Sequence, residues 1–350
     1  MTDNPGGIES YLMGLLRRVP AGTFDFLCDF PSIAYGEEIA ARGSRVYYIP
    51  AKSRSLPGHW RGTSRVLWEH PEYGTVYLNV LDAGCVFLAV IPWLYRRRIV
   101  VHSHNGGTDK MRLHRLCRPV LDRITGGRAA CSDEASLHMF GRTGEDILFV
   151  PNAIDTSRYA YDPAVRAEKR RELGLGDSLT VCHVGRISRQ KNPLFLLDIF
   201  ARIRAKRPDA VLLSVGEGEM AEEFDGYIRE KGLEDCVLRL GRRSDVPALL
   251  QAADVFLLPS LYEGLSIALL EVQAAGLPAV ASDVISPQTV ITDTVRLMSL
   301  AESPEAWAGA VLAAAETGRA DTAGALARAG FDSSRSGESD RRLLALLLGG

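Results

Sequence analysis

The sequence has 350 residues, of which 46% are hydrophobic and 24% charged, and its formal net charge is −2. This length exceeds what one hydrophobic core usually organises, so we expect two domains of about 150 residues each. The near-neutral charge, and the lack of aromatic residues interleaved with basic ones, disfavour a nucleic-acid reader.

The N-terminal half contains short apolar runs separated by stretches of helical character. Such alternation predicts a parallel sheet with crossover helices, a Rossmann-like domain. The expected strands are residues 24–28, 46–49, 75–78, 99–101 and 147–150.

A basic segment lies between residues 96 and 128. It holds nine Lys or Arg against two Asp, a net charge of +7, so the remainder of the chain carries −9. A basic face of this kind can attract an anionic membrane surface or a phosphorylated acceptor. A solvated, arginine-rich helix is the alternative interpretation.

The C-terminal half shows the same alternation more regularly, which predicts a second Rossmann-like domain. The charged segment Tyr159 to Asp177, with the Pro151-Asn152 turn, marks the boundary between the two halves. The expected strands are residues 179–184, 210–215, 237–240, 254–258 and 279–282, and the helices between them are residues 193–206, 219–231, 245–252 and 265–275.

The first motif that could carry chemistry is the run GRISRQK at residues 185–191, between a strand and a helix. Ligands of open α/β sheets bind beyond the carboxyl ends of the strands, so Arg186 and Lys191 stand where a diphosphate would bind. Arginine can grip a phosphate with two hydrogen bonds, and lysine supplies a mobile charge. Exposed cations at helix starts are also common for structural reasons.

The second motif is EGLSIALLE at residues 263–271, a loop acid followed by a helix. We expect the helix to open at Gly264, so that its first N–H groups lack intrahelical partners and form an anion site. Glu271 then lies on the order of 10 Å along the axis, where a carboxylate could accept both hydroxyls of a ribose. An acidic residue inside a mostly apolar helix favours a ligand role, whereas Glu263 alone could be a solvated loop acid.

The cysteines and apolar runs bear on the compartment. The six cysteines form no C-x-x-C pair, so neither a zinc site nor a disulfide framework is indicated. The longest apolar run, Val86 to Tyr95, is too short to span a bilayer, and the first residues do not resemble a leader. We expect a cytoplasmic protein, with peripheral contact of segment 96–128 on the inner face of the membrane.

The runs HVGRISRQKNP and LPSLYEGLSIALLEVQAAGLPAVASD, within residues 183–283, resemble the retaining glycosyltransferases of family 4 that act on capsular, exopolysaccharide and lipid-linked acceptors. Weaker matches are GGIE at 6–9, VHSHN at 101–105 and PNAID at 151–155. The resemblance implies the GT-B fold, in which two Rossmann-like domains face each other across a cleft. The acceptor domain would comprise residues 1–157 with a returning helix in 333–350, and the donor domain residues 158–332.

By the same resemblance, Arg186 and Lys191 bind the diphosphate, Glu263 faces the donor sugar and Glu271 binds the ribose. The backbone of three residues in the second motif would hold phosphate and sugar hydroxyls. These are Gly264, Leu265 and Ser266.

Two further positions follow from the resemblance. Gly7 resembles a glycine that lets an N-terminal loop approach the diphosphate, and His104, preferred to His102, resembles a histidine that contacts the donor sugar. Gly216 follows a predicted strand and is expected to border the nucleotide, and contacts around Arg242 are expected to contribute to donor specificity. One departure is that only residues 1–5 precede the glycine pair, so we expect the N-terminal sheet to lack its first strand.

The function implied is transfer of a hexose or N-acetylhexosamine from a nucleoside-diphosphate sugar, with UDP expected, to a hydroxyl of a saccharide or lipid-linked acceptor, with retention. No cofactor or metal is expected, because no D-x-D pair stands in a suitable loop. A nucleotide-sugar epimerase of the same architecture and a catalytically silent sugar-nucleotide-binding protein remain alternatives. An oxidoreductase is disfavoured, because no complete G-x-G-x-x-G follows a strand.

Overall fold

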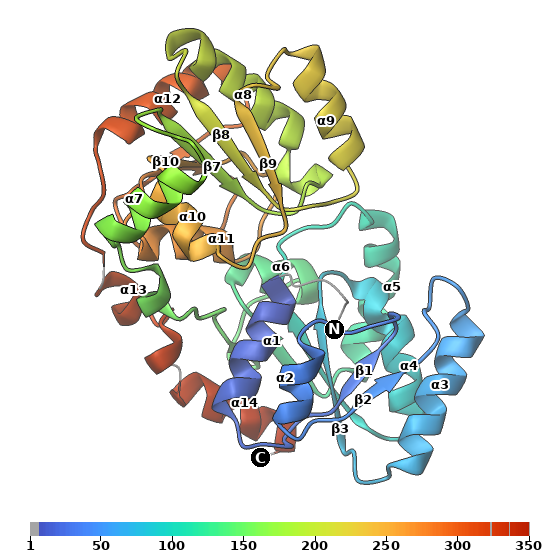
Figure 1. The fold of residues 1–350 in the computed structure, drawn as a ribbon. Helices are drawn as coiled ribbons and strands as arrows, with labels where there is room; N and C mark the ends of the chain where they lie inside the picture. Colours follow the sequence, from blue (N-terminus) through green and yellow to red (C-terminus); the bar gives the residue numbers. More distant parts are fainter. Residues whose placement is uncertain (1–6, 323, 336, 350) are drawn as a thin grey trace. The chain divides into compact units, whose positions relative to one another are not determined.

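The computed structural model describes residues 7–322, 324–335 and 337–349. The chain forms two compact units, one from residues 1–153 with 333–350 and the other from residues 154–332 (Figure 1). We call them the first and the second unit. Each is built on parallel strands with helices between them, so the predicted α/β class is confirmed.

The second unit is built on a parallel sheet of six strands in the order β12-β11-β10-β7-β8-β9. The inner strands are buried on both faces, which explains their continuous apolar sequences. The strands are β7 (Thr180–Val184), β8 (Val211–Val215), β9 (Val237–Gly241), β10 (Val255–Leu258), β11 (Ala279–Ser282) and β12 (Val295–Met298).

Helices of this unit bury apolar side chains against the sheet, with Phe200, Phe224 and Trp307 among the fully buried ones. Several helices begin with proline in the first turn, where the missing N–H costs nothing. The helices are η2 (Thr156–Tyr159), α7 (Pro163–Glu172), η3 (Arg189–Lys191), α8 (Pro193–Lys206), α9 (Ala221–Glu230), α10 (Val246–Ala252), α11 (Ile267–Ala274), η4 (Pro287–Thr289), α12 (Pro304–Glu316) and α13 (Ala325–Arg328).

The first unit divides its strands between two sheets. A four-stranded parallel sheet has the order β3-β4-β5-β6, and β1 pairs only with β2. No strand among the described residues joins the two sheets. The strands are β1 (Phe26–Cys28), β2 (Val46–Tyr48), β3 (Thr75–Val80), β4 (Arg98–Ser103), β5 (Gly127–Ala130) and β6 (Ile147–Phe149).

The last helix belongs to the first unit and is tied to it by polar contacts. Arg18 donates two hydrogen bonds to Asp340, and the Thr75 hydroxyl donates to the Leu347 carbonyl at 2.6 Å. The helices of the unit are α1 (Gly7–Arg18), α2 (Gly36–Ala41), α3 (Leu56–Glu69), η1 (Ala83–Cys85), α4 (Val86–Leu94), α5 (Met111–Ile124), α6 (Asp133–Phe140), η5 (Ser333–Arg335) and α14 (Gly337–Leu348).

Two strands escape the sequence analysis, and helices α9 and α11 start two or more residues later than predicted. Strand β5 has the sequence GRAA, which lacks both an apolar run and a β-branched residue, and β12 is a short edge strand with partly exposed side chains. Helix α11 begins at Ile267 rather than at Gly264.

Within the described part of the chain, no helix combines the length and apolarity needed to cross a membrane.

Candidate functional site

The two motifs of the second unit meet at the carboxyl end of its sheet. Strands β7 and β10 are neighbours, so the loops that follow them lie side by side. The Leu261 N–H donates to the Gln190 carbonyl at 2.8 Å, which joins the two loops directly. This arrangement brings Lys191 and Glu263 together.

Glu263 is buried, at 7% exposure, and its carboxylate accepts hydrogen bonds from three neighbouring side chains. The Lys191 ammonium forms a short ion pair with Oε1, and the Ser260 hydroxyl donates to the same oxygen at 2.8 Å. The Gln190 amide donates to Oε2 at 3.3 Å. A buried carboxylate needs such partners to stay charged, so this cluster is a preformed polar site rather than a solvated loop acid.

The ammonium of Lys191 retains donor capacity for a ligand. It has three protons, and its hydrogen bond to Glu263 uses one of them. The loop also brings Gly185 against the lysine stem, where an added Cβ would lie 3.2 Å from Cε. The ion pair and this packing therefore restrict where the Lys191 ammonium can lie beyond the end of β7. Such positioning is what binding a phosphate at a defined place requires.

Arg186 does not join this cluster. Its guanidinium pairs with Glu219 at 2.9 Å, and both side chains are more than half exposed. An exposed ion pair of this kind is weak, so the arginine can exchange its partner for an anionic ligand at little cost.

The loop before α11 offers backbone donors, although the helix itself starts at Ile267. Gly264, Leu265 and Ser266 are buried in this loop, and none of their N–H groups donates a hydrogen bond to a described residue. Ser266 occupies the N-cap position without a side-chain cap, and its buried hydroxyl has no partner among the described residues. The predicted anion site therefore lies in the loop as well as at the helix start.

Glu271 lies on α11 and is held by a tyrosine that the sequence analysis did not identify. The Tyr159 hydroxyl donates to Glu271 Oε1 at 2.6 Å, and Tyr159 itself is buried in η2. The Tyr159 carbonyl accepts a hydrogen bond from Gln251 of α10 at 3.0 Å, which anchors the backbone of Tyr159. Burial raises the pKa of Glu271 to about 7, against the smaller lowering by the Tyr159 hydrogen bond.

This raised pKa predicts a pH-dependent affinity for a diol ligand. If the ionised carboxylate of Glu271 accepts both ribose hydroxyls, UDP affinity should follow the ionised fraction, which rises about tenfold between pH 6 and pH 8. Titration calorimetry with UDP at both pH values checks this, and Glu271→Gln should flatten the profile. Equal pH dependence in wild type and variant would contradict a ligand role.

The same shift has a defined effect on stability. Because the folded pKa lies above the ordinary 4.5, the folded state holds the proton more tightly than the unfolded chain. The contribution of Glu271 to stability is complete below about pH 4.5 and is lost as the pH rises through 7. Glu271→Gln should therefore stabilise the protein more at pH 8 than at pH 5, as measured by thermal unfolding.

Gly216 follows β8 in a conformation with φ of +132°. A Cβ at this position would lie 2.0 Å from the Gly185 carbonyl oxygen, so close backbone packing between the two loops requires glycine. The same holds for Gly218, whose added Cβ would lie 2.1 Å from the Ile187 oxygen. Arg242, exposed at the end of β9, follows at the same edge of the sheet.

The first unit holds His104 in a buried polar cluster. His104 Nε2 lies 2.9 Å from Asn79 Oδ1, and the His102 and His104 ring centroids are 4.0 Å apart. The Tyr77 hydroxyl contacts His102 Nδ1 at 2.6 Å and the Tyr11 hydroxyl at 3.0 Å. Burial lowers the pKa of His104 to about 3, so both its nitrogens act as those of a neutral imidazole.

Gly7 is the first residue of α1 and is exposed, and Gly6 of the glycine pair lies outside the described residues. Three groups that hold the acids were not predicted from the sequence: Ser260, Gln190 and Tyr159. Gln190 stands inside the first motif and Ser260 lies three residues before the second, and only their placement after neighbouring strands could have singled them out. Tyr159 is far from Glu271 in sequence and left no signal.

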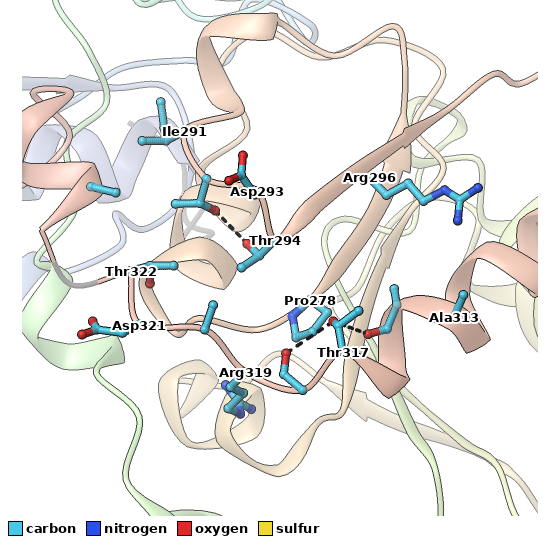
Figure 2. Close-up of a pocket in the computed structure, with 15 residues that line it drawn as sticks. Pro278, Ile291, Asp293, Thr294, Arg296, Ala313, Thr317, Arg319, Asp321 and Thr322 are labelled. Atoms are coloured by element: carbon cyan, nitrogen blue, oxygen red, sulfur yellow. Dashed lines mark hydrogen bonds between the residues drawn. The ribbon is translucent and has the colours of Figure 1, made fainter.

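A cavity of about 660 Å³ lies at the other edge of the same sheet, where β11 and β12 begin (Figure 2). The Arg319 guanidinium, one of its basic groups, is engaged by the carbonyls of Leu250, Gln251, Ala253 and Ala275. No predicted site residue lines this cavity. The predicted site residues of the second unit lie instead beyond the carboxyl ends of the strands.

Comparison with known proteins places these motifs in a family. Residues 165–327 match the family described as Glycosyl transferases group 1. The chain is 31% identical over 333 residues to EpsF of Bacillus subtilis, named as a glycosyltransferase, and the match covers 90% of this chain and 86% of that protein.

Two further relatives differ in donor. One is the UDP-Gal:alpha-D-GlcNAc-diphosphoundecaprenol alpha-1,3-galactosyltransferase of Escherichia coli, 38% identical over 39% of this chain and 37% of that protein. The other is a GDP-mannose-dependent alpha-(1-6)-phosphatidylinositol monomannoside mannosyltransferase of Mycolicibacterium smegmatis, 33% identical over 79% of this chain and 76% of that protein.

Solved structures agree on the fold. HepE of Anabaena, solved with UDP-glucose, superposes with a TM-score of 0.83 at 21% identity, over 98% of this chain and 97% of that one. WaaG, a glycosyltransferase of lipopolysaccharide biosynthesis, gives 0.72 at 18% identity, over 100% of this chain and 98% of that one. The α/β units therefore match the GT-B fold, and the similarity of EpsF over most of both chains shows that this protein belongs to the group 1 glycosyltransferases.

Proposed function

We propose that this glycosyltransferase moves a hexose or N-acetylhexosamine from a nucleoside-diphosphate sugar to a hydroxyl of a saccharide or lipid-linked acceptor, with retained anomeric configuration. The observation that carries the proposal is the Lys191–Glu263 pair, preformed at the carboxyl end of the second unit's sheet beside backbone N–H groups that donate to no described residue. A cation for a phosphate and an acid for a sugar thus stand on adjoining loops.

The donor is proposed to be a UDP-sugar. HepE, which shares the fold, was solved with UDP-glucose and with UDP, and the Escherichia coli relative uses UDP-Gal. The Mycolicibacterium smegmatis relative depends on GDP-mannose, so guanosine donors are the competing class. Glu271 accepts ribose hydroxyls in either case, and the base is read elsewhere.

Each site residue has a proposed role. Lys191 and Arg186, the latter after leaving Glu219, neutralise charge on the departing diphosphate. Glu263 faces the donor sugar and Glu271 holds the ribose. With two cations available for the leaving group, the reaction is proposed to need no metal, and turnover that survives treatment with EDTA would support this.

The remaining site residues belong to this proposal too. Gly7 and Gly216 would border the diphosphate and nucleotide, Arg242 would contribute to donor choice, and His104, held neutral, would contact the donor sugar. The saccharide or lipid-linked acceptor is proposed to be reached at a membrane, which the basic segment 96–128 contacts peripherally on the inner face.

A donor panel tests the proposal. Purified protein is incubated with UDP- and GDP-sugars, thermal stabilisation identifies the donor, and labelled donor is then followed with saccharide acceptors and lipid extracts. Transfer with an α-to-α outcome by NMR supports a retaining UDP-sugar transferase. Isomerised donor without acceptor would instead support an epimerase, and binding without turnover would support a silent binder.

A further inference from the structure

Helix α5 exposes an apolar stripe that its packing does not use. His114, Cys117 and Leu121 form the buried face of the helix. Leu113, Leu116 and Val120 each precede one of these buried residues, so they form a second apolar row beside the buried one. This row is exposed to solvent, with Leu116 at 75%. The apolar surface of α5 thus extends from the core into solvent.

Seven of the nine cations in the basic segment fall into two groups. Arg97, Arg98 and Arg128 are engaged at the start of the strands, with the Leu67 and Gly126 carbonyls and with Asp122. The four cations of α5 stay exposed and form no ion pair with a described carboxylate: Arg112, Arg115, Arg118 and Arg123. Helix α5 therefore carries a cluster of cations that no described carboxylate neutralises.

The neighbouring helices continue the exposed apolar surface. Helix α4 packs between α3 and α5 (Figure 1), and an added Cβ on Gly84, just before α4, would lie 3.5 Å from Leu113. Trp93 at 50% and Leu94 at 60% are exposed at the end of α4, and Trp68 at 78% is exposed on α3. Arg61 and Arg65 flank a groove of about 520 Å³ beside Trp68.

We propose that this α3–α5 face, made of the exposed apolar and arginine side chains named above, docks the protein on an anionic lipid bilayer. The inference deepens the proposed function, since it assigns the proposed membrane contact to a surface wider than segment 96–128. Apolar side chains, tryptophans and flanking arginines are the combination that binds at the headgroup level, with apolar burial and lipid charge acting together.

Charge complementarity favours the bilayer over a second copy of the chain. A twofold dimer through this face would oppose Arg112 and Arg115 to the same arginines of its partner, and like charges in contact oppose association. An anionic bilayer supplies negative charge to all of them at once. An acidic protein surface would also complement the arginines, but negative charge does not account for the exposed apolar row on α5.

Vesicle co-sedimentation of the full chain tests the inference. Phosphatidylcholine vesicles are compared with vesicles of equal parts phosphatidylcholine and phosphatidylglycerol at low salt. Wild type should bind the anionic vesicles only. Arg112→Gln/Arg115→Gln should lower the partition about thirtyfold, and Leu113→Ser/Leu116→Ser at least tenfold.

The controls separate this inference from the proposed function. Arg171→Gln/Arg229→Gln removes the same charge from the second unit, and Leu348→Ser removes a similarly exposed leucine, so both should bind vesicles like wild type. UDP binding should be unchanged in every variant. Wild type that ignores anionic vesicles while binding UDP overturns the inference alone, as does a dimer lost only in Leu113→Ser/Leu116→Ser without vesicle binding.

Discussion

Replacing Lys191 by alanine is expected to reduce donor turnover by about a thousandfold. The ammonium lies at the carboxyl end of the second unit's sheet with a side-chain exposure of 14%, and in the proposed role its loss removes a charge that stabilises the departing diphosphate. The same change leaves Glu263 buried without its counterion, which should cost about 3 kcal/mol of unfolding free energy. Steady-state kinetics and denaturant unfolding of the variant measure the two effects.

The second effect must be separated from the first, because an unstable enzyme also loses activity. Lys191→Ala/Glu263→Gln removes the orphaned charge, so it should recover most of the stability while turnover stays low. Near-normal turnover in Lys191→Ala would contradict the role of the lysine. Recovery of turnover together with stability in the double variant would reduce Lys191 to a structural partner of Glu263.

Adding a single methyl group at Gly218 is expected to cost about 3 kcal/mol of stability and to weaken UDP binding. The new Cβ would lie 2.1 Å from the Ile187 carbonyl oxygen and 2.6 Å from its carbon, so the backbone of the 185–191 loop must move. Lys191 sits at the end of that loop, and a displacement of about 1 Å in a binding group can cost a hundredfold in rate. Thermal unfolding and UDP titration of Gly218→Ala check both effects.

Gly309→Ala is the matched control for this substitution. Gly309 lies inside α12, and an added Cβ there meets no atom within 4 Å. Because alanine loses less conformational entropy in a helix than glycine, the control should be stabilised by about 0.5–1 kcal/mol and should bind UDP normally. A Gly218→Ala variant as stable as this control would disprove the close packing of the two loops.

The sequence predicts much of the fold because the four inner strands of the second unit are almost entirely buried. Such strands read as continuous apolar runs, and β11 (Ala279–Ser282) coincides with its predicted range. The composition of β5, with Gly127 and Arg128, carries no strand signal, and its place is fixed by pairing with β4 and β6. Pairing with neighbouring strands therefore determines the structure of a segment whose own sequence shows no preference for a strand.

The candidate site likewise contains residues that the local sequence predicts and others that only tertiary packing brings in. Lys191 and Glu263 were each predicted as site residues because each follows a strand, but their contact depends on β7 and β10 being neighbours, which only the structure shows. The tyrosine on Glu271 could not be predicted, since Tyr159 is 112 positions away and reaches the helix only through the packing of η2 on α11. The motif also did not predict that Arg186 pairs with Glu219 in this structure.

A crystal structure of the protein with UDP tests the donor site most directly. The site predicts the diphosphate within hydrogen-bond distance of Lys191 Nζ and of the backbone N–H groups at 264–266, with both ribose hydroxyls on Glu271. UDP in the cavity lined by Arg296 and Arg319, with Lys191 still bound only to Glu263, would contradict the account.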